Sequence, residues 1–115
     1  MSTPHDVASA RFLCEELDME IVKVASADIV DGFLHQYLTT TKADVILSNG
    51  LASLGEIEKA LEYYGEHQDD IALLHCVSNY PCSDQSLNLS ALEVLAKAFD
   101  LAVGYSDHSI DGFAN

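Results

Sequence analysis

In IALLHCVSNYP, residues 71–81, an apolar run ends in a cluster of polar and aromatic side chains. The same pattern recurs three times along the chain, in IVKVASAD (residues 21–28), DVILSNG (residues 44–50) and AVGYSDHS (residues 102–109). Each apolar run has the length and composition of a buried β-strand. Segments with a helical spacing of apolar residues separate the runs. An alternation of strands and helices indicates parallel strands that are joined by crossover helices.

Four helices are predicted from apolar residues that recur at intervals of three and four. We expect them at residues 5–17, after Pro4 as a start signal, and at residues 31–39, 53–64 and 88–99. Ser53 and Glu56 have the spacing of a capping box at the start of the third helix. Asn88 or Ser90 is the expected cap of the fourth helix.

The length of the chain sets a limit on this α/β fold. A chain of 115 residues forms one domain with a modest core, whereas a closed β/α barrel takes about 250 residues. We therefore expect residues 1–115 to form a partial barrel of about four strands and four helices. No strand is expected in front of the first helix, and residues 112–115 resemble the start of another helix. These features predict an internal piece of a longer protein, or a truncated copy of one.

The composition excludes several classes of partner. Five Lys and Arg residues stand against 19 Asp and Glu residues, which gives a formal net charge of -14. We therefore expect no nucleic acid and no anionic membrane as a partner. No apolar stretch approaches the roughly 20 residues of a membrane span, and no secretory signal is recognised, so a cytoplasmic protein is expected. The three cysteines lack the spacing of a disulfide framework or a zinc site.

The carboxyl ends of parallel strands carry the chemistry of β/α proteins, so the polar clusters are expected to converge on one rim. Lys23 lies inside an apolar strand, where its side chain would reach the interior or the mouth of a barrel and bind an anion. A solvent-exposed edge strand would explain Lys23 equally well. Ser26 and Asp28 could hydrogen-bond a polyol or a phosphate at the rim, or cap the next helix.

The second and third strand ends add further candidates. Gly50 suits a tight turn whose amides can approach a ligand, although a plain turn after Ser48 and Asn49 explains the glycine as well. His75 follows two leucines and is better explained as a core residue than as a ligand. Tyr80 is the stronger candidate for a position at the rim.

The fourth strand ends in Ser106, Asp107 and His108. Imidazole is the commonest metal-binding side chain near neutral pH, and the neighbouring carboxylate could orient the ring or share the ion. One histidine does not make a metal site, so further ligands would have to come from outside this sequence. No nucleophile triad and no glycine-rich phosphate loop is recognised.

Taken together, KVASAD, VILSNG, LLHCVSNYP and VGYSDHS resemble the N-acetylneuraminate (sialic acid) synthase family in order and spacing. This family includes legionaminic acid, pseudaminic acid and spore-coat polysaccharide synthases. The resemblance covers essentially the whole chain, which would correspond to the third helix through the seventh strand of a (β/α)8 TIM barrel. It implies that strands one to three, strand eight and a C-terminal antifreeze-like domain lie outside this sequence.

The resemblance implies a transferase that condenses phosphoenolpyruvate with an N-acylated amino sugar, such as N-acetylmannosamine, to a nonulosonic acid. A divalent metal, Mn2+ or Mg2+, would polarise the aldehyde oxygen of the open-chain sugar. By matching position, the residues expected to contact phosphoenolpyruvate are Lys23, Ser26, Ser48 and Ser106. Those expected to contact the sugar are Asp28, Ser78, Asn79 as a possible substitute for Ser78, and Tyr80. The metal ligand would be His108, which with Lys23 forms the expected catalytic pair.

Some features depart from the family pattern. The family's usual glutamate is Asp28 here, and a second metal-binding histidine and a second lysine fall on segments outside this sequence. We therefore expect this piece alone to be inactive and to associate with itself, as a homodimer for example, through unpaired strand edges. Two alternatives stay open: another barrel lyase or aldolase that uses phosphoenolpyruvate or pyruvate, and a non-catalytic remnant that acts only in protein association.

Overall fold

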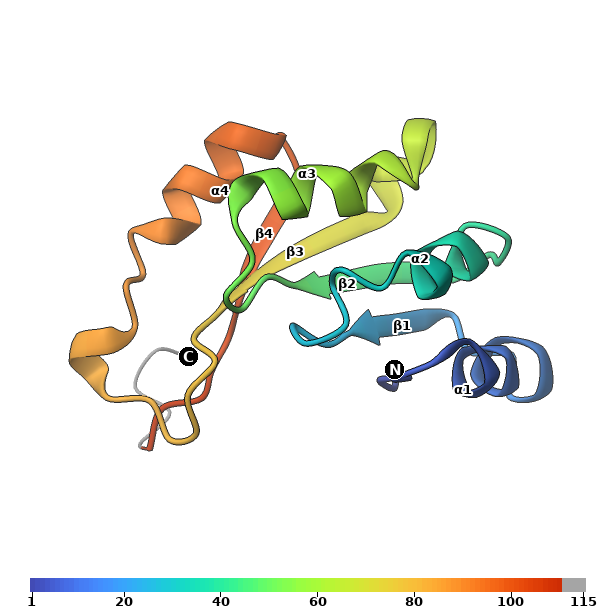
Figure 1. Cartoon of the computed structure of the whole chain (residues 1–115), viewed down its shortest axis with the longest axis horizontal. Coiled ribbons are helices and arrows are strands. Elements are labelled where there is room, and N and C mark those ends of the chain that lie inside the picture. The colour runs from blue at the N-terminus through green and yellow to red at the C-terminus, as the bar shows by residue number, and fades with distance from the viewer. Residues whose placement is uncertain (111–115) are drawn as a thin grey trace.

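The computed structural model describes residues 1–110, apart from the side chain of Asp69, so the helix expected at residues 112–115 lies outside the described part. Four strands form one sheet: β1 (Ile21–Val24), β2 (Asp44–Ser48), β3 (Ile71–Cys76) and β4 (Ala102–Ser106). They follow the order β1-β2-β3-β4, and each neighbouring pair is parallel (Figure 1). The predicted parallel α/β fold is confirmed.

The helices lie in the connections between these strands. They are α1 (Val7–Arg11), α2 (Gly32–Leu38), α3 (Leu54–Glu62) and α4 (Ala91–Phe99), and two short 3-10 helices cover Gly65–Asp70 and Asp84–Ser86. Helices α3 and α4 lie along the same side of the sheet (Figure 1). Within residues 1–110, no helix is both long enough and apolar enough to cross a membrane.

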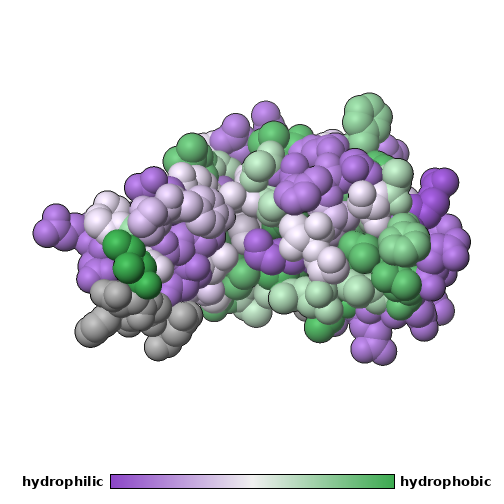
Figure 2. Space-filling view, turned by 90° about the horizontal axis from the view of Figure 1, so that it is seen from below, coloured by the Kyte–Doolittle hydropathy of each residue, from purple (hydrophilic) through white to green (hydrophobic). Residues whose placement is uncertain are grey.

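The core lies between the sheet and the helices. Strand register aligns apolar side chains in two rows that face the helices, and each of these residues is at most 3% exposed. The rows consist of Val22, Val45 and Ile71, and of Val24, Leu47 and Leu73. On the opposite face, Lys23, Ile46 and Leu74 are half-buried, whereas Ser48 and Cys76 are buried. Seen from below, the molecule shows apolar and polar side chains interspersed over its surface (Figure 2).

The segment in front of α1 pairs with the sheet, contrary to the expectation that no strand precedes the first helix. Ser2 forms a parallel bridge with Val22, and the backbone N–H of Lys23 donates to the Ser2 carbonyl over 2.9 Å. The edge of β1 is therefore partly covered, and the residues that follow Ser2 run toward the carboxyl end of the sheet.

The helix predicted over residues 5–17 forms over residues 7–16, but it is not a regular α-helix throughout. Asp6, rather than Pro4, marks its start, since the Asp6 carboxylate accepts a hydrogen bond from the Ser9 N–H over 2.7 Å. After Arg11 the chain widens into a π-helical turn, Phe12–Glu16, which is closed by a hydrogen bond from Leu17 to Phe12. The wider turn breaks the 3.6-residue periodicity. Phe12 and Leu17, which the pattern placed on the buried face, are consequently 55% and 53% exposed.

The two predicted helix caps have different outcomes. Ser53 and Glu56 form the expected capping box at α3, with the Ser53 N–H donating to the Glu56 carboxylate over 2.8 Å. Ser90 precedes α4, but its hydroxyl donates to the Asn88 side chain over 2.9 Å and caps no helical N–H. The first N–H of α4 donates instead to the backbone carbonyl of Asn88.

His35 ties α2 to the end of α3 from a position that is 1% exposed. Its Nε2 donates to the Ile29 carbonyl over 2.7 Å, so Nδ1 is the acceptor and receives the Tyr64 hydroxyl proton over 2.8 Å. Burial lowers the pKa of His35 below its usual 6.5, and burial raises the pKa of Tyr64. Both groups are therefore neutral in the folded protein.

Stability should fall as the pH drops below about 6.5, because the unfolded chain then takes up a proton that folded His35 cannot hold. The slope from this group should reach up to about 1.4 kcal/mol per pH unit until the lowered pKa is passed. His35→Gln keeps a donor and an acceptor without titrating, so it should flatten the slope, whereas His67→Gln at an exposed site should not. Urea denaturation between pH 5 and 8 measures this, and identical slopes for all three proteins would contradict it.

Candidate active site

Three of the four residues predicted to contact phosphoenolpyruvate share one face of the sheet. Side chains along a strand point alternately to the two faces of the sheet. Strand register therefore places Lys23, Ser48 and Ser106 on the same face, opposite the rows that face the helices. Lys23 lies between buried Val22 and Val24 and is itself only half-buried. Lys23 therefore lies on the face opposite the helix-facing rows, and β1 is also an outer strand of the described sheet, so both explanations offered for this lysine stay predictions.

A tight turn at Gly50 brings two further hydroxyls together. Gly50 has a φ of +51°, and a Cβ added to it would lie 2.7 Å from the Ser78 hydroxyl oxygen and 2.9 Å from that of Ser26. Only a residue without a side chain fits this space. Next to it, buried Asn49 accepts the Cys76 N–H through its side-chain oxygen over 3.0 Å, which fixes the end of β2 against β3.

The hydroxyl of Ser48 is buried without a partner. Ser48 is 1% exposed, and its Oγ has no hydrogen bond to any residue that the structure describes. A buried polar atom without a partner costs stability, so such atoms often mark places where a ligand or an ion completes the site.

Asp28 contacts a residue that the sequence reasoning missed. The Asp28 carboxylate accepts a hydrogen bond from Nδ1 of His5 over 2.6 Å. Capping of α2, the other explanation for Ser26 and Asp28, is excluded because Asp31 accepts the helical N–H groups of Phe33 and Leu34. No local signal could have shown the pair, because His5 and Asp28 are 23 positions apart.

His108 and Tyr80 come together across 28 positions of sequence. Nδ1 of His108 donates to the Val77 carbonyl over 2.6 Å, so Nε2 carries the lone pair and accepts the Tyr80 hydroxyl over 2.9 Å. The two rings stack with centroids 4.0 Å apart, and Tyr80 is 75% exposed, as expected for the rim.

Asp107 was one candidate to orient the His108 ring, but the Val77 carbonyl bonds Nδ1. The Asp107 carboxylate accepts the Ser109 N–H over 2.8 Å, and this hydrogen bond lowers the pKa of Asp107. A ring N–H that is fixed by a backbone carbonyl, with a lone pair on the other nitrogen, is the usual arrangement of a metal-binding histidine. Among residues 1–110, however, no three His, Cys, Asp or Glu side chains gather to hold an ion.

The remaining predicted residues of the third strand end separate into core and rim. His75 is 6% exposed, and its Nε2 donates to the Leu87 carbonyl over 2.9 Å, which confirms the core interpretation. Ser78 and Asn79 are exposed in the turn after β3. Of these two, only Ser78 is shown next to the Gly50 turn.

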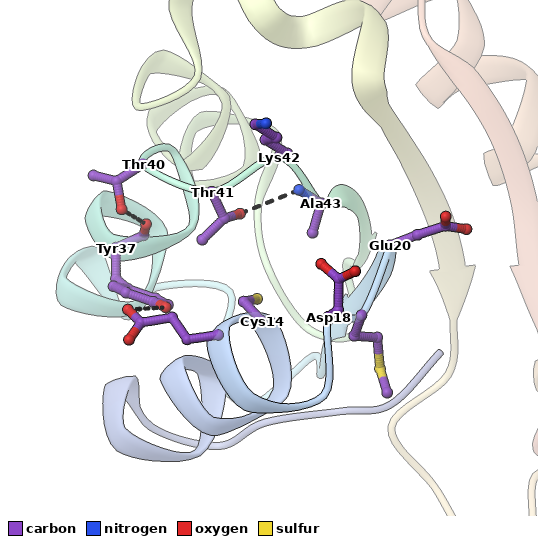
Figure 3. Close-up of a pocket in the computed structure, with 10 residues that line it drawn as sticks. Cys14, Asp18, Glu20, Tyr37, Thr40, Thr41, Lys42 and Ala43 are labelled. Atoms are coloured by element: carbon purple, nitrogen blue, oxygen red, sulfur yellow. Dashed lines mark hydrogen bonds between the residues drawn. The ribbon is translucent and has the colours of Figure 1, made fainter.

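A hollow of about 570 Å³ lies at the opposite, amino-terminal end of β1 and β2 (Figure 3). Cys14, Glu20, Thr41 and Lys42 are among its lining residues. Burial raises the pKa of the Cys14 thiol, so this cysteine is not an activated nucleophile. Cys14, which the sequence placed in the core, is only half-buried and borders this hollow.

Comparison with known proteins matches this arrangement to one family. The model of the NeuB family covers residues 1–115. The chain belongs to the NeuB family. Among curated proteins, it is similar to the N,N'-diacetyllegionaminic acid synthases of Campylobacter jejuni and Legionella pneumophila, at 40% identity to each. The matches cover 95% and 96% of this chain but only 33% and 32% of those synthases.

Solved structures of NeuB-like proteins share the fold. The N-acetylneuraminic acid synthetase of Leptospira borgpetersenii, solved with citrate, has a TM-score of 0.86 at 41% identity. The spore-coat protein spsE of Bacillus subtilis has a TM-score of 0.89 at 32% identity. These matches cover 93% and 95% of this chain, and 37% and 31% of the solved chains. The four parallel strands are thus part of a TIM-type barrel, and the chain spans about a third of the relatives' length.

The Gly50 turn can be tested with two glycines of the same conformation. Gly50→Ala should destabilise the chain by the cost of a left-handed alanine, about 1–2 kcal/mol, and by the additional clash with Ser26 and Ser78. Gly65 has a φ of +52° but open space around it, so Gly65→Ala reports the backbone cost alone. Urea denaturation of both variants should show the larger loss for Gly50→Ala, and equal losses would contradict the close approach.

Proposed function

We propose that this chain forms the phosphoenolpyruvate-binding part of a synthase that condenses phosphoenolpyruvate with an N-acylated amino sugar. The placement of Lys23, Ser48 and Ser106 on one face of the sheet, opposite the helix-facing rows, is the single observation that carries the proposal. It supplies one cation and several hydroxyls, which suit a small anion with phosphate and carboxylate groups. Because the chain spans about a third of its relatives, the activity belongs to a complete barrel rather than to residues 1–115 alone.

The residues have separable roles in this proposal. Lys23 provides the local positive charge that an anion needs in a chain with a net charge of -14. The unpartnered hydroxyl of Ser48 would donate to a ligand oxygen, and the hydroxyls of Ser26 and Ser78, which both lie against Gly50, would do so at the rim. Fixed donors of this kind hold the substrate in one orientation before any bond is made.

His108 would hold a divalent ion, Mn2+ or Mg2+, which polarises the aldehyde oxygen of the sugar when it is bound. The hydrogen bond from Nδ1 to the Val77 carbonyl supports this role, because it leaves the lone pair on Nε2. The Tyr80 hydroxyl would have to leave Nε2 for an ion to bind there, and would then be free to contact the sugar. Further ligands would come from outside residues 1–110.

The sugar itself and the assembly stay predictions. The relatives are named for legionaminic, pseudaminic and neuraminic acids, which supports an N-acylated amino sugar as the acceptor and N-acetylmannosamine as a first candidate. Self-association is supported by the sheet order, since β4 has one outer edge with no strand beside it among the described residues. A cytoplasmic location likewise stays a prediction.

Lys23→Met should weaken phosphoenolpyruvate binding by about 1.5–3 kcal/mol, the range for a charge-assisted hydrogen bond, while keeping the apolar stem. The assay uses a chimaera in which residues 1–115 replace the matching third of the Campylobacter jejuni synthase, and calorimetry measures the affinity. Lys42→Met, at the amino-terminal hollow, is the matched control and should bind normally. Equal affinity in the Lys23 variant and the unmodified chimaera would make Lys23 a structural strand residue.

His108→Ala should reduce the Mn2+ affinity of the same chimaera at least about tenfold, because one side chain that would bind the ion directly is removed. Electron paramagnetic resonance of free Mn2+ measures this without turnover. Tyr80→Phe removes the competing donor to Nε2 and should leave Mn2+ affinity equal or higher. An unchanged affinity in His108→Ala would refute the assignment.

A further inference from the structure

His5 and Asp28 form an oriented pair. A carboxylate can only accept, so Nδ1 of His5 carries the hydrogen of the 2.6 Å contact. In the neutral ring this contact leaves the lone pair on Nε2, and Nε2 has no hydrogen bond to any described residue. The Asp28 side chain is 18% exposed whereas that of His5 is 67% exposed. The largely buried carboxylate of Asp28 thus orients the solvent-exposed imidazole of His5.

The pair is not needed to start either neighbouring helix. Asp6 caps α1 through the Ser9 N–H, and Asp31 caps α2 through two N–H groups. Pairs between exposed side chains also contribute little to stability. Helix capping therefore leaves the contact between His5 and Asp28 unexplained.

The pair lies at the carboxyl end of the sheet. Ser2 pairs in parallel with Val22, so His5 follows three residues further toward that end. Asp28 follows β1 and comes two residues after Ser26, whose hydroxyl lies at the Gly50 turn. The open Nε2 therefore belongs to the same rim as the proposed phosphoenolpyruvate site.

We propose that His5 contacts the amino sugar through Nε2, which accepts a hydrogen bond from a sugar hydroxyl. Asp28 is then a positioning residue that fixes the ring and its tautomer, as a carboxylate behind an imidazole does elsewhere. A lone pair suits a hydroxyl donor and repels the oxygens of phosphoenolpyruvate, so this subsite selects the acceptor sugar. The inference rests on the proposed function and adds a residue to its sugar site.

Two substitutions separate the two ring nitrogens. His5→Asn places an amide nitrogen near the position of Nδ1 and can still donate to Asp28, but nothing replaces Nε2. His5→Gln places a polar atom near the position of Nε2. In the chimaera, His5→Asn should raise the KM for the sugar about tenfold, with kcat and the KM for phosphoenolpyruvate within twofold. His5→Gln should stay within about threefold of the unmodified chimaera.

Binding is measured independently on the 115-residue chain by NMR. Addition of N-acetylmannosamine should shift the Cε1–H resonance of His5, and should leave that of exposed His67 unchanged as an internal control. In Asp28→Asn the ring loses its fixed tautomer, so the shift of His5 should shrink. A Tm within about 2 °C of the parent chain excludes a folding defect in each variant.

The outcomes separate this inference from the proposed function. An active chimaera whose sugar KM is unchanged in His5→Asn overturns the role of His5 and leaves the synthase proposal standing. An inactive chimaera together with a sugar-dependent shift of His5 supports the subsite and overturns the proposed reaction. Shifts confined to Tyr80 and His108 overturn the subsite, and a chain in which no rim resonance shifts overturns both.

Discussion

Parallel pairing of consecutive strands is the constraint on which the rest of the molecule depends. Each strand of the order β1-β2-β3-β4 hydrogen-bonds to the next along the chain, so every connection must cross back along the sheet. The helices therefore gather against the sheet, and all four carboxyl ends point the same way. Register then decides which side chains share a face. Lys23, Ser48 and Ser106 lie on the same face because each occupies an alternate position along its strand.

The features that could be predicted from the sequence are those that depend on short-range periodicity. Apolar runs located the strands, and the spacing of Ser53 and Glu56 located the start of α3, since both signals lie within a few residues. The lysine inside an apolar strand was expected to reach the interior or the mouth of a barrel, or to lie on an exposed edge strand, and register places it on the face opposite the helix-facing rows. The irregular part of the first helix was missed, because a π-helical turn departs from the period of 3.6 residues on which the prediction rested.

The contacts that build the site could not be read from the sequence, because they join distant positions. His5 forms a hydrogen bond with Asp28, and His108 forms one with the Val77 carbonyl. The side chains of Ser26 and Ser78 both lie against Gly50. The fold brings these pairs together, and no short-range pattern in the sequence predicts which distant positions come into contact. The resemblance to a family supplied residue roles at matching positions, but it gave no role to His5.

The tautomers of four histidines follow their place in the fold. In the core, His35 and His75 donate through Nε2 to backbone carbonyls, which leaves Nδ1 as the acceptor. At the rim, His5 and His108 donate through Nδ1, which leaves Nε2 as the acceptor. Nε2 lies farther from the backbone than Nδ1, so a lone pair on it reaches toward ligands. The fixed donor contact thus leaves a different ring nitrogen as the acceptor in the two core histidines and in the two histidines at the rim, and the roles proposed for His5 and His108 rest on this difference.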